Sequence, residues 1–196
     1  MSDAAPLDPV RCAWAGNDPR MIDYHNLEWG RALHDETSLF EMLCLEGAQA
    51  GLSWSTILNR RDGYRAAYDG FDIDRIAAYE DARQAELLED KRIIRNRAKV
   101  RAFRDNARAT LDLRGSAGGL DHYLWDFVGG EPIVNRFDSP EQIPPQTPLS
   151  EALSIDLRKR GFHFVGPVIV YAYMQSTGLV SDHTIDCFRH PDAVPA

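Results

Sequence analysis

The chain has no apolar run long enough to cross a membrane. Its longest nearly apolar stretch, residues 164–174, is well short of the roughly 20 apolar residues that a membrane helix needs. The first eight residues, MSDAAPLD, also lack the basic and apolar regions of a signal peptide. We therefore expect a protein of the cytoplasm that does not act at a membrane.

Cysteine is scarce as well. The chain has three, Cys12, Cys44 and Cys187, and both the odd number and a reducing compartment disfavour a disulfide framework. Metal ligation or plain burial therefore explains these cysteines better. Cys44 lies between Leu43 and Leu45 in an apolar segment, which predicts a place in the core.

Alternating strand patterns are almost absent, whereas helical periodicity runs through most of the chain, which indicates an all-α protein. Ser38 with Glu41 predicts a capping box, and Asp72 and Ser150 are predicted caps. Five prolines between residues 131 and 148 predict an extended connector instead of a helix. Helices are predicted over residues 36–50, 54–68, 73–79, 82–89, 97–112, 120–128, 150–160 and 166–177.

An overall positive charge is also missing. The net charge of -8 argues against a generally basic protein that coats nucleic acid. The basic residues are nevertheless concentrated, because residues 91–108 carry eight of them and one acid, for a net charge of +7 against -15 elsewhere. Such a face can bind phosphate locally. The alternative is a solvated helix face whose arginines pair with acids such as Glu86 and Glu89.

The basic segment includes a possible helical hairpin. Residues 85–104 indicate a helix, a short turn and a second helix, which can offer N-terminal N–H groups to a phosphate. The turn contains no glycine, so by itself the pattern is weak evidence for a phosphate contact.

Glu46 interrupts an apolar stripe. Positions 39, 43, 46 and 50 have helical spacing and read Leu, Leu, Glu and Ala. A carboxylate that faces a core is unfavourable without a partner, and no basic residue lies three or four positions away along the helix. Two interpretations remain open: a pocket for an electron-poor ring, or a buried acid paired with a helix N-terminus or a distant arginine. Four aromatic residues near it in sequence favour the pocket: Trp14, Tyr24, Trp29 and Trp54.

Five possible metal ligands lie near the two ends of the chain. Two thiolates and two imidazoles suit tetrahedral zinc in a closed structural site. If the C-terminal segment is helical, spacings of four and of three residues both bring two ligands to one ion, so spacing does not select the set. The alternative is two buried thiols and ordinary surface histidines. The candidates are Cys12, His25, His183, Cys187 and His190.

Long ungapped segments of the chain closely resemble the DNA-3-methyladenine glycosylase I family. They include every unusual residue described above, follow the family's order and span residues 11–191. The segments are CAW at 12–14, DYHNLEWG at 23–30, LFEMLCLEGAQAGLSW at 39–54, KRGFHFVG at 159–166 and GLVSDH at 178–183.

The resemblance implies an all-α helix-hairpin-helix DNA glycosylase fold. It implies one domain of two helical lobes over residues 11–191, with the connector at 131–148 and flexible ends at 1–10 and 192–196. It also implies a structural zinc that ties the two chain ends together, and it favours Cys187 over His190. The implied zinc ligands are Cys12, His25, His183 and Cys187.

The resemblance further implies an enzyme that flips 3-methyladenine out of alkylated double-stranded DNA and removes it by hydrolysis. It assigns Glu46 and Tyr24 to polar recognition of the base, with Glu46 as the catalytic group, and Trp54 to stacking. Trp14 and Trp29 complete the aromatic wall. No lysine stands out as a Schiff-base nucleophile, so we expect a monofunctional enzyme that releases free base. We also expect a monomer, although no sequence pattern indicates the oligomeric state. The predicted DNA contacts are Lys91, Arg92, Arg95, Arg97 and Lys99.

The chain departs from the family pattern at three positions. Met21 stands where relatives commonly carry an aromatic residue near the pocket, and Arg92 and Ala98 stand where they often have glycine in the hairpin. Rival interpretations are a zinc-containing module that only senses alkylated DNA, the same enzyme acting on another alkylpurine such as 3-methylguanine, and a metallohydrolase. The last would use His25 and Glu28 with His183 around a catalytic zinc.

Overall fold

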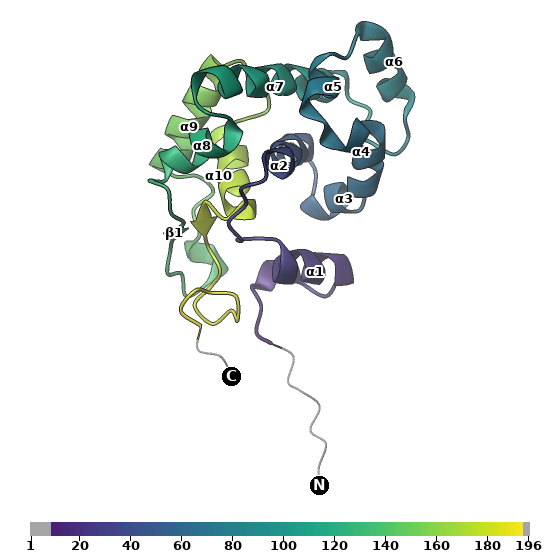
Figure 1. The fold of residues 1–196 in the computed structure, drawn as a ribbon. Coiled ribbons are helices and arrows are strands. Elements are labelled where there is room, and N and C mark those ends of the chain that lie inside the picture. The colour runs from purple at the N-terminus through teal and green to yellow at the C-terminus, as the bar shows by residue number, and fades with distance from the viewer. Residues whose placement is uncertain (1–8, 194–196) are drawn as a thin grey trace.

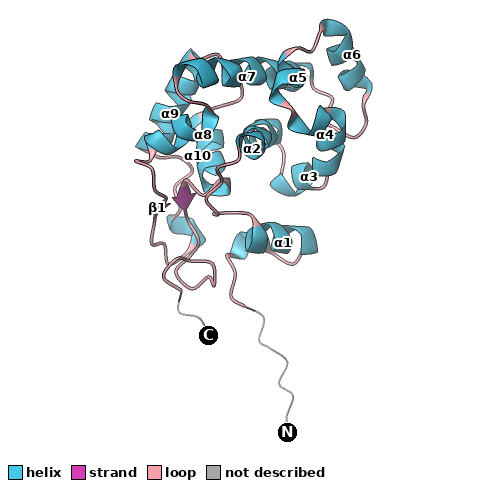
Figure 2. Cartoon of the chain, in the orientation of Figure 1, coloured by secondary structure: helices cyan, strands magenta, loops and turns pink. Residues whose placement is uncertain are grey.

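The computed structural model describes residues 9–193, so the predicted flexible ends lie largely outside the described part of the chain. Figure 2 shows that the described residues are mainly helical, which confirms the predicted all-α class. The helices are α1 (Pro19–Leu27), α2 (Glu36–Gln49), α3 (Trp54–Leu58), α4 (Arg61–Ala67), α5 (Ile73–Ala77), α6 (Asp81–Glu89), α7 (Arg97–Ser116), α8 (Leu120–Phe127), α9 (Pro148–Lys159) and α10 (Pro167–Ser176).

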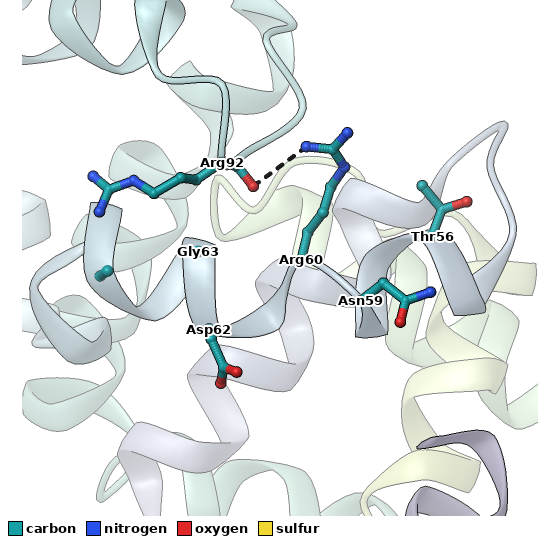
Figure 3. Close-up of a pocket in the computed structure, with 7 residues that line it drawn as sticks. Thr56, Asn59, Arg60, Asp62, Gly63 and Arg92 are labelled. Atoms are coloured by element: carbon teal, nitrogen blue, oxygen red, sulfur yellow. Dashed lines mark hydrogen bonds between the residues drawn. The ribbon is translucent and has the colours of Figure 1, made fainter. Parts of the chain in front are cut away.

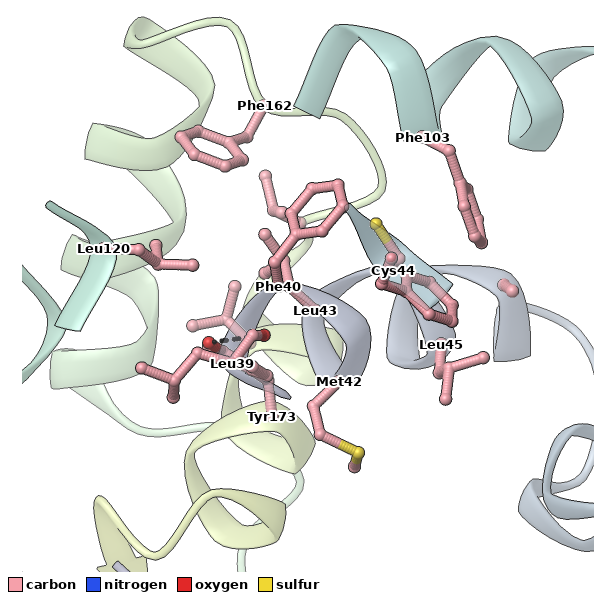
Figure 4. Packing of buried hydrophobic residues seen from close by; sticks show 14 of the residues in the cluster. Leu39, Phe40, Met42, Leu43, Cys44, Leu45, Phe103, Leu120, Phe162 and Tyr173 are labelled. Carbon is pink, nitrogen blue, oxygen red and sulfur yellow. Dashed lines mark hydrogen bonds between the residues drawn. The ribbon is translucent and has the colours of Figure 1, made fainter. Parts of the chain in front are cut away.

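Helix α2 is the centre of the molecule. It contacts α3, α7, α8 and α10, and every residue from 39 to 48 is buried. Figure 1 shows α3 to α6 on one side of α2 and α8 to α10 on the other, with α7 extending across both groups. The apolar stripe predicted for this helix was therefore too narrow, because packing surrounds the helix. Figure 4 shows Phe40, Leu43 and Cys44 among the side chains of this core, which confirms the prediction for Cys44.

Two of the predicted helix caps are corrected. Helix α2 begins at Glu36, as predicted, but its cap is Asp35, whose side chain accepts a hydrogen bond from Ser38 N at 2.8 Å. The predicted capping box is absent there, since Glu41 pairs with two arginines instead. Helix α9 begins at Pro148, and Ser150 closes a capping box with Thr147 as the cap. The predicted cap Asp72 is confirmed.

Three other features differ from the predictions. The predicted helix at 54–68 is two helices, because the backbone leaves the helical conformation at Arg60, between α3 and α4. Helix α1 was not predicted. The connector at 131–148 contains strand β1 (Ile133–Val134) and a short 3₁₀ helix (Pro140–Gln142), so only part of it is extended.

The connector brings the C-terminal segment back to the N-terminal one. Strand β1 pairs in parallel with β2 (Val180–Ser181), with Ile133 opposite Val180. Beyond β2, Phe188 N donates to Val10 O at 3.0 Å. Figure 1 shows the two ends of the described chain, purple and yellow, on the same side of the molecule. No helix among residues 9–193 is long and apolar enough to span a membrane.

Candidate active site and metal centre

One pocket gathers every residue that was predicted to bind the base. Its volume is about 400 Å³, and it lies where α1, α2, α3 and α10 meet beside the connector. Side chains far apart in sequence therefore face one space. The predicted residues in its lining are Glu46, Tyr24, Trp14, Trp29, Trp54 and Met21.

Helix α1 supplies Met21 and Tyr24 to this pocket. The side chain of Asp18 caps the helix by accepting from Arg20 N at 2.8 Å, and Pro19 occupies the first helical position. Both are ordinary signals of a helix start, and they could have revealed α1 in the sequence. The helix was missed because its apolar periodicity is weak.

The aromatic wall is a set of rings in contact. The ring centroids of Trp14 and Trp29 are 4.9 Å apart in an edge-on arrangement, and those of Tyr24 and Trp54 are 5.1 Å apart. The indole nitrogens of Trp14 and Trp54 are buried and have no hydrogen-bond partner in the described residues. Four aromatic side chains thus make up much of the pocket lining.

Glu46 is an isolated acid in the lining of this pocket. It is 5% exposed, and no ion pair to it is found in the part of the chain that the structure describes. Burial raises the pKa of Glu46 to about 8, while a hydrogen bond with Ser176 acts in the opposite direction. An acid of this kind gains an interaction from a ligand that brings a positive charge or an N–H group. The alternative of a pairing with a distant arginine is wrong for Glu46.

A second acid on α2 makes the contrast clear. Glu41 is also buried, but it accepts hydrogen bonds from Arg61 Nε at 2.5 Å and from Arg65 Nε at 3.0 Å. Two cations therefore satisfy Glu41 and none satisfies Glu46.

Tyr24 is the second polar group of the pocket. Its hydroxyl is almost fully buried, and burial raises its pKa well above 10, with the nearby charges of Glu46 and Glu28 acting in the same direction. The hydroxyl consequently keeps its proton and remains a hydrogen-bond donor as well as an acceptor.

Several pocket residues were not predicted. Gln49 follows Glu46 by three positions on α2, so helical spacing could have identified it. Ala172 and Gln175 come from α10, and Pro140 and Ile143 from the connector. The sequence gives no signal for Pro140 and Ile143. The connector reaches the pocket through its pairing with the C-terminal segment, which begins with β1 and β2.

Four predicted metal ligands also come together. The donor atoms of Cys12, His25, His183 and Cys187 all lie within 4.8 Å of one another, and all four residues are buried. Cys187 Sγ is 3.4 Å from His25 Nε2 and 3.5 Å from His183 Nδ1. With bonds of about 2.3 Å to sulfur and about 2.0 Å to nitrogen, tetrahedral zinc separates S and N by about 3.5 Å. The set therefore fits a four-coordinate zinc ion.

In both histidines, the ring nitrogen that faces away from the cysteine sulfurs has a hydrogen-bond partner that supports this fit. His25 Nδ1 lies 2.9 Å from Asn26 Oδ1, and His183 Nε2 lies 3.3 Å from Trp29 O. Each contact favours the tautomer that leaves the inner nitrogen free to bind a metal. Gly30 permits the close packing, since a Cβ there would lie 2.7 Å from His183 Nε2.

Two alternatives for the metal site are corrected. His190 is buried but separate, with Nε2 3.2 Å from Asn135 O and Nδ1 accepting from Asp192 N. The metallohydrolase set fails because Glu28 forms an ion pair with Arg61 and is not in the group. The C-terminal ligands come from a turn, in which Cys187 N donates to Thr184 O, and not from a helix.

The basic segment forms the predicted hairpin from α6, the turn at residues 90–96 and α7. Lys91, Arg95 and Arg97 are exposed, and no ion pair to them is found in the described part of the chain. Arg92 is exposed but forms an ion pair with Asp90 at 2.7 Å. Asn96 caps α7 by accepting from Lys99 N.

The rest of the basic segment serves the fold. Lys99 is 7% exposed, and its Nζ donates to Ala48 O at 2.8 Å and Ala50 O at 2.7 Å at the end of α2. The prediction that Lys99 contacts DNA is corrected, because its charge faces the interior. Arg101 and Arg104 pair with Asp105 and Asp81, and not with the acids named as their alternative partners.

Comparisons with known proteins agree with this site. The model of the methyladenine glycosylase family matches residues 14–190. The chain belongs to this family. DNA-3-methyladenine glycosylase 1 of Escherichia coli (strain K12) is 44% identical over 185 residues, which cover 94% of this chain and 99% of that relative. The prediction made from sequence segments is confirmed.

Solved structures of the glycosylase family share the fold. A crystal structure of 3-methyladenine DNA glycosylase I superposes with a TM-score of 0.91 at 47% identity, covering 93% of this chain and 100% of that one. The enzyme from Staphylococcus aureus, studied for its 3-methyladenine recognition, superposes with a TM-score of 0.90 at 31% identity, covering 94% and 98%.

The pKa of Glu46 predicts a specific pH dependence of stability. Its ordinary value of 4.5 applies to the unfolded chain, and the value of about 8 to the folded one, so the folded protein holds a proton that the unfolded chain releases in between. The contribution of Glu46 to the free energy of unfolding should therefore fall as pH rises from 4.5 to 8, and Glu46→Gln should remove this loss. Urea unfolding of both proteins at pH 5 and pH 8 measures it. From pH 5 to pH 8, we expect Glu46→Gln to gain roughly 3 to 4 kcal/mol of stability relative to wild type. An equal difference at both pH values would contradict the raised pKa.

Proposed function

We propose that this protein is a monofunctional DNA-3-methyladenine glycosylase of base-excision repair, which hydrolyses the bond between 3-methyladenine and deoxyribose in alkylated duplex DNA. The observation that carries the proposal is Glu46, a buried acid in an aromatic pocket of about 400 Å³ that has no cationic partner among residues 9–193. Full-length relatives bear this name, and one solved neighbour is a complex with 3-methyladenine.

The pocket suits a cationic purine. Methylation at N3 gives adenine a positive charge while it remains in DNA, and aromatic faces attract such a ring by about 0.5 to 2 kcal/mol per contact. The same charge lowers the pKa of a neighbouring acid, so binding favours ionised Glu46, which then accepts a hydrogen bond from the exocyclic amine. Neutral adenine brings no charge and gains less. Recognition can thus supply most of the selectivity.

The chemical step needs little acid catalysis, because the methylated base leaves as a neutral molecule. The lesion first leaves the base stack, and weak stacking of a damaged base lowers that cost. Glu46 then holds the base and stabilises the positive charge that develops on the sugar while water attacks. The chain has only three lysines, Lys91, Lys99 and Lys159, and none lines the pocket, which supports hydrolysis without strand cleavage.

Zinc and DNA complete the proposal. Cys12, His25, His183 and Cys187 would hold a structural zinc with no open position for catalysis, because all four of its ligands come from the protein. Lys91, Arg95, Arg97 and the exposed N-terminus of α7 would bind backbone phosphates. Arg92 adds charge at the same turn.

Excision from methylated duplex DNA tests this function. The purified protein is incubated with the DNA, the released bases are separated chromatographically, and borohydride is added to a parallel reaction. We expect 3-methyladenine as the main product, less 3-methylguanine, and no trapped adduct. Binding of alkylated DNA without release of any base would support the sensor alternative, and a trapped adduct would show a lyase.

A further inference from the structure

The hairpin turn of this chain is packed unusually closely against helix α4. A Cβ added to Gly63 of α4 would lie 2.8 Å from both Arg92 Cβ and Arg92 O. Gly63 has helical backbone geometry, where glycine is less favourable than alanine. Close approach, and not backbone conformation, therefore explains a glycine at this position (Figure 3).

Two further contacts hold the backbone of the turn. Arg60 donates from its guanidinium to Lys91 O at 2.9 Å and to Arg92 O at 3.5 Å, and Figure 3 shows this side chain reaching toward the Arg92 carbonyl. Tyr64 accepts a hydrogen bond at its hydroxyl from Ile94 N at 3.2 Å. Residues 60 to 64 thus bind the turn at three successive points, through a donor, a close contact and an acceptor.

The turn also has contacts of its own, since Asp90 accepts a hydrogen bond from Arg92 N at 2.8 Å and Ile93 is buried in the core. It has no glycine, and Arg92 directs its guanidinium to Asp90 within the same turn. Yet this turn presents Lys91 and Arg95 and leads into the N-terminus of α7. A phosphate contact through backbone N–H groups and side chains requires those groups to be fixed before binding.

We propose that Arg60, Gly63 and Tyr64 are positioning residues for DNA binding, which hold the turn at 90–96 in the conformation that contacts phosphate. Gly63 leaves in α4 the space that the Cβ and the carbonyl oxygen of Arg92 occupy. This inference rests on the proposed function and assigns to α4 a role in DNA binding without DNA contact.

Arg60→Gln tests the hydrogen bonds, with Arg75→Gln as a matched control. Both variants remove one arginine charge, and the exposed side chain of Arg75 pairs, among the described residues, with Asp72 alone. Fluorescence titration gives the Kd for duplex DNA at several salt concentrations, excision kinetics give kcat and KM, and calorimetry gives the affinity for free 3-methyladenine.

We expect Arg60→Gln to weaken DNA binding and raise KM about tenfold, since it removes charge-assisted hydrogen bonds. The values of kcat and of the affinity for the free base should stay within about twofold of wild type, as should every value for Arg75→Gln. Arg60→Lys keeps a charged donor and should recover most of the DNA affinity. Equal behaviour of Arg60→Gln and Arg75→Gln would overturn the proposal.

A double-mutant cycle tests the close contact. Gly63→Ala should weaken DNA binding about tenfold by displacing the turn. Arg92→Gly should relieve this loss only in part, because it removes Arg92 Cβ but leaves the Arg92 carbonyl oxygen 2.8 Å from the added Cβ. Independent losses that multiply would contradict the role of Gly63. Thermal unfolding checks that each variant is folded, and Arg60→Gln carries the test if Gly63→Ala is not. Failure of the wild type to release or bind 3-methyladenine would instead reject the proposed function.

Discussion

The Glu46→Gln variant is expected to release 3-methyladenine from alkylated DNA about 100-fold more slowly than wild type. Glutamine keeps the size of the side chain and an acceptor oxygen but loses the negative charge. That charge is the component that distinguishes a cationic base from neutral adenine, and no other acid lines the pocket within the described residues. Single-turnover excision gives the rate, and calorimetry with free 3-methyladenine gives the loss of base affinity.

Glu41→Gln is the matched control for this prediction. Glu41 is a buried glutamate on the same helix, but it is paired with Arg61 and Arg65 and does not line the pocket. Its loss should lower the free energy of unfolding by roughly 2 kcal/mol and leave the excision rate near that of wild type. Glu46→Gln should show the opposite pattern, with higher stability at pH 8 and little excision. Near-normal excision by Glu46→Gln would remove Glu46 from the mechanism.

The different roles of Glu46 and Glu41 show which features of the site the sequence could predict. Glu46 was predictable because an acid without a partner at helical spacing breaks an apolar stripe, and this is a local property. The pairing of Glu41 with arginines 20 and 24 residues away is not local, and the capping box assigned to Glu41 was wrong for that reason. Likewise, Lys99 belonged to a basic segment by composition, and only the packing of α7 on α2 directs its charge to the end of α2.

The fold shows the same difference between local features, which the sequence predicts, and contacts between distant residues, which it does not. Long periodic helices such as α7 were predicted near their true positions, whereas the break between α3 and α4 was not. At that break the side chain of Arg60 reaches the hairpin backbone, a contact between residues about 30 positions apart that no local pattern reveals. The parallel pair of β1 and β2 has two residues in each strand, too few for an alternating pattern, and it joins segments that are more than 40 residues apart.

The metal centre gives the second large prediction: Cys187→Ser should lose its zinc and unfold more easily than wild type by several kcal/mol. The four ligands join segments separated by about 160 residues, so the ion restricts most of the unfolded chain. Metal analysis after dialysis measures zinc per chain, and thermal unfolding with and without a chelator measures the stabilisation. The chelator should destabilise wild type and leave Cys187→Ser unchanged.

Two variants make this prediction specific to the ligand set. Cys44→Ala removes a buried thiol in the core, and His190→Ala removes the histidine that sequence spacing left as an alternative ligand. Both should keep one zinc per chain. The contact of His183 with Trp29 O adds a further consequence, because Trp29 belongs to the pocket wall. Loss of zinc should therefore weaken binding of free 3-methyladenine even below the unfolding temperature. Full zinc content in Cys187→Ser, or loss of zinc in His190→Ala, would show that the ligand set is wrong.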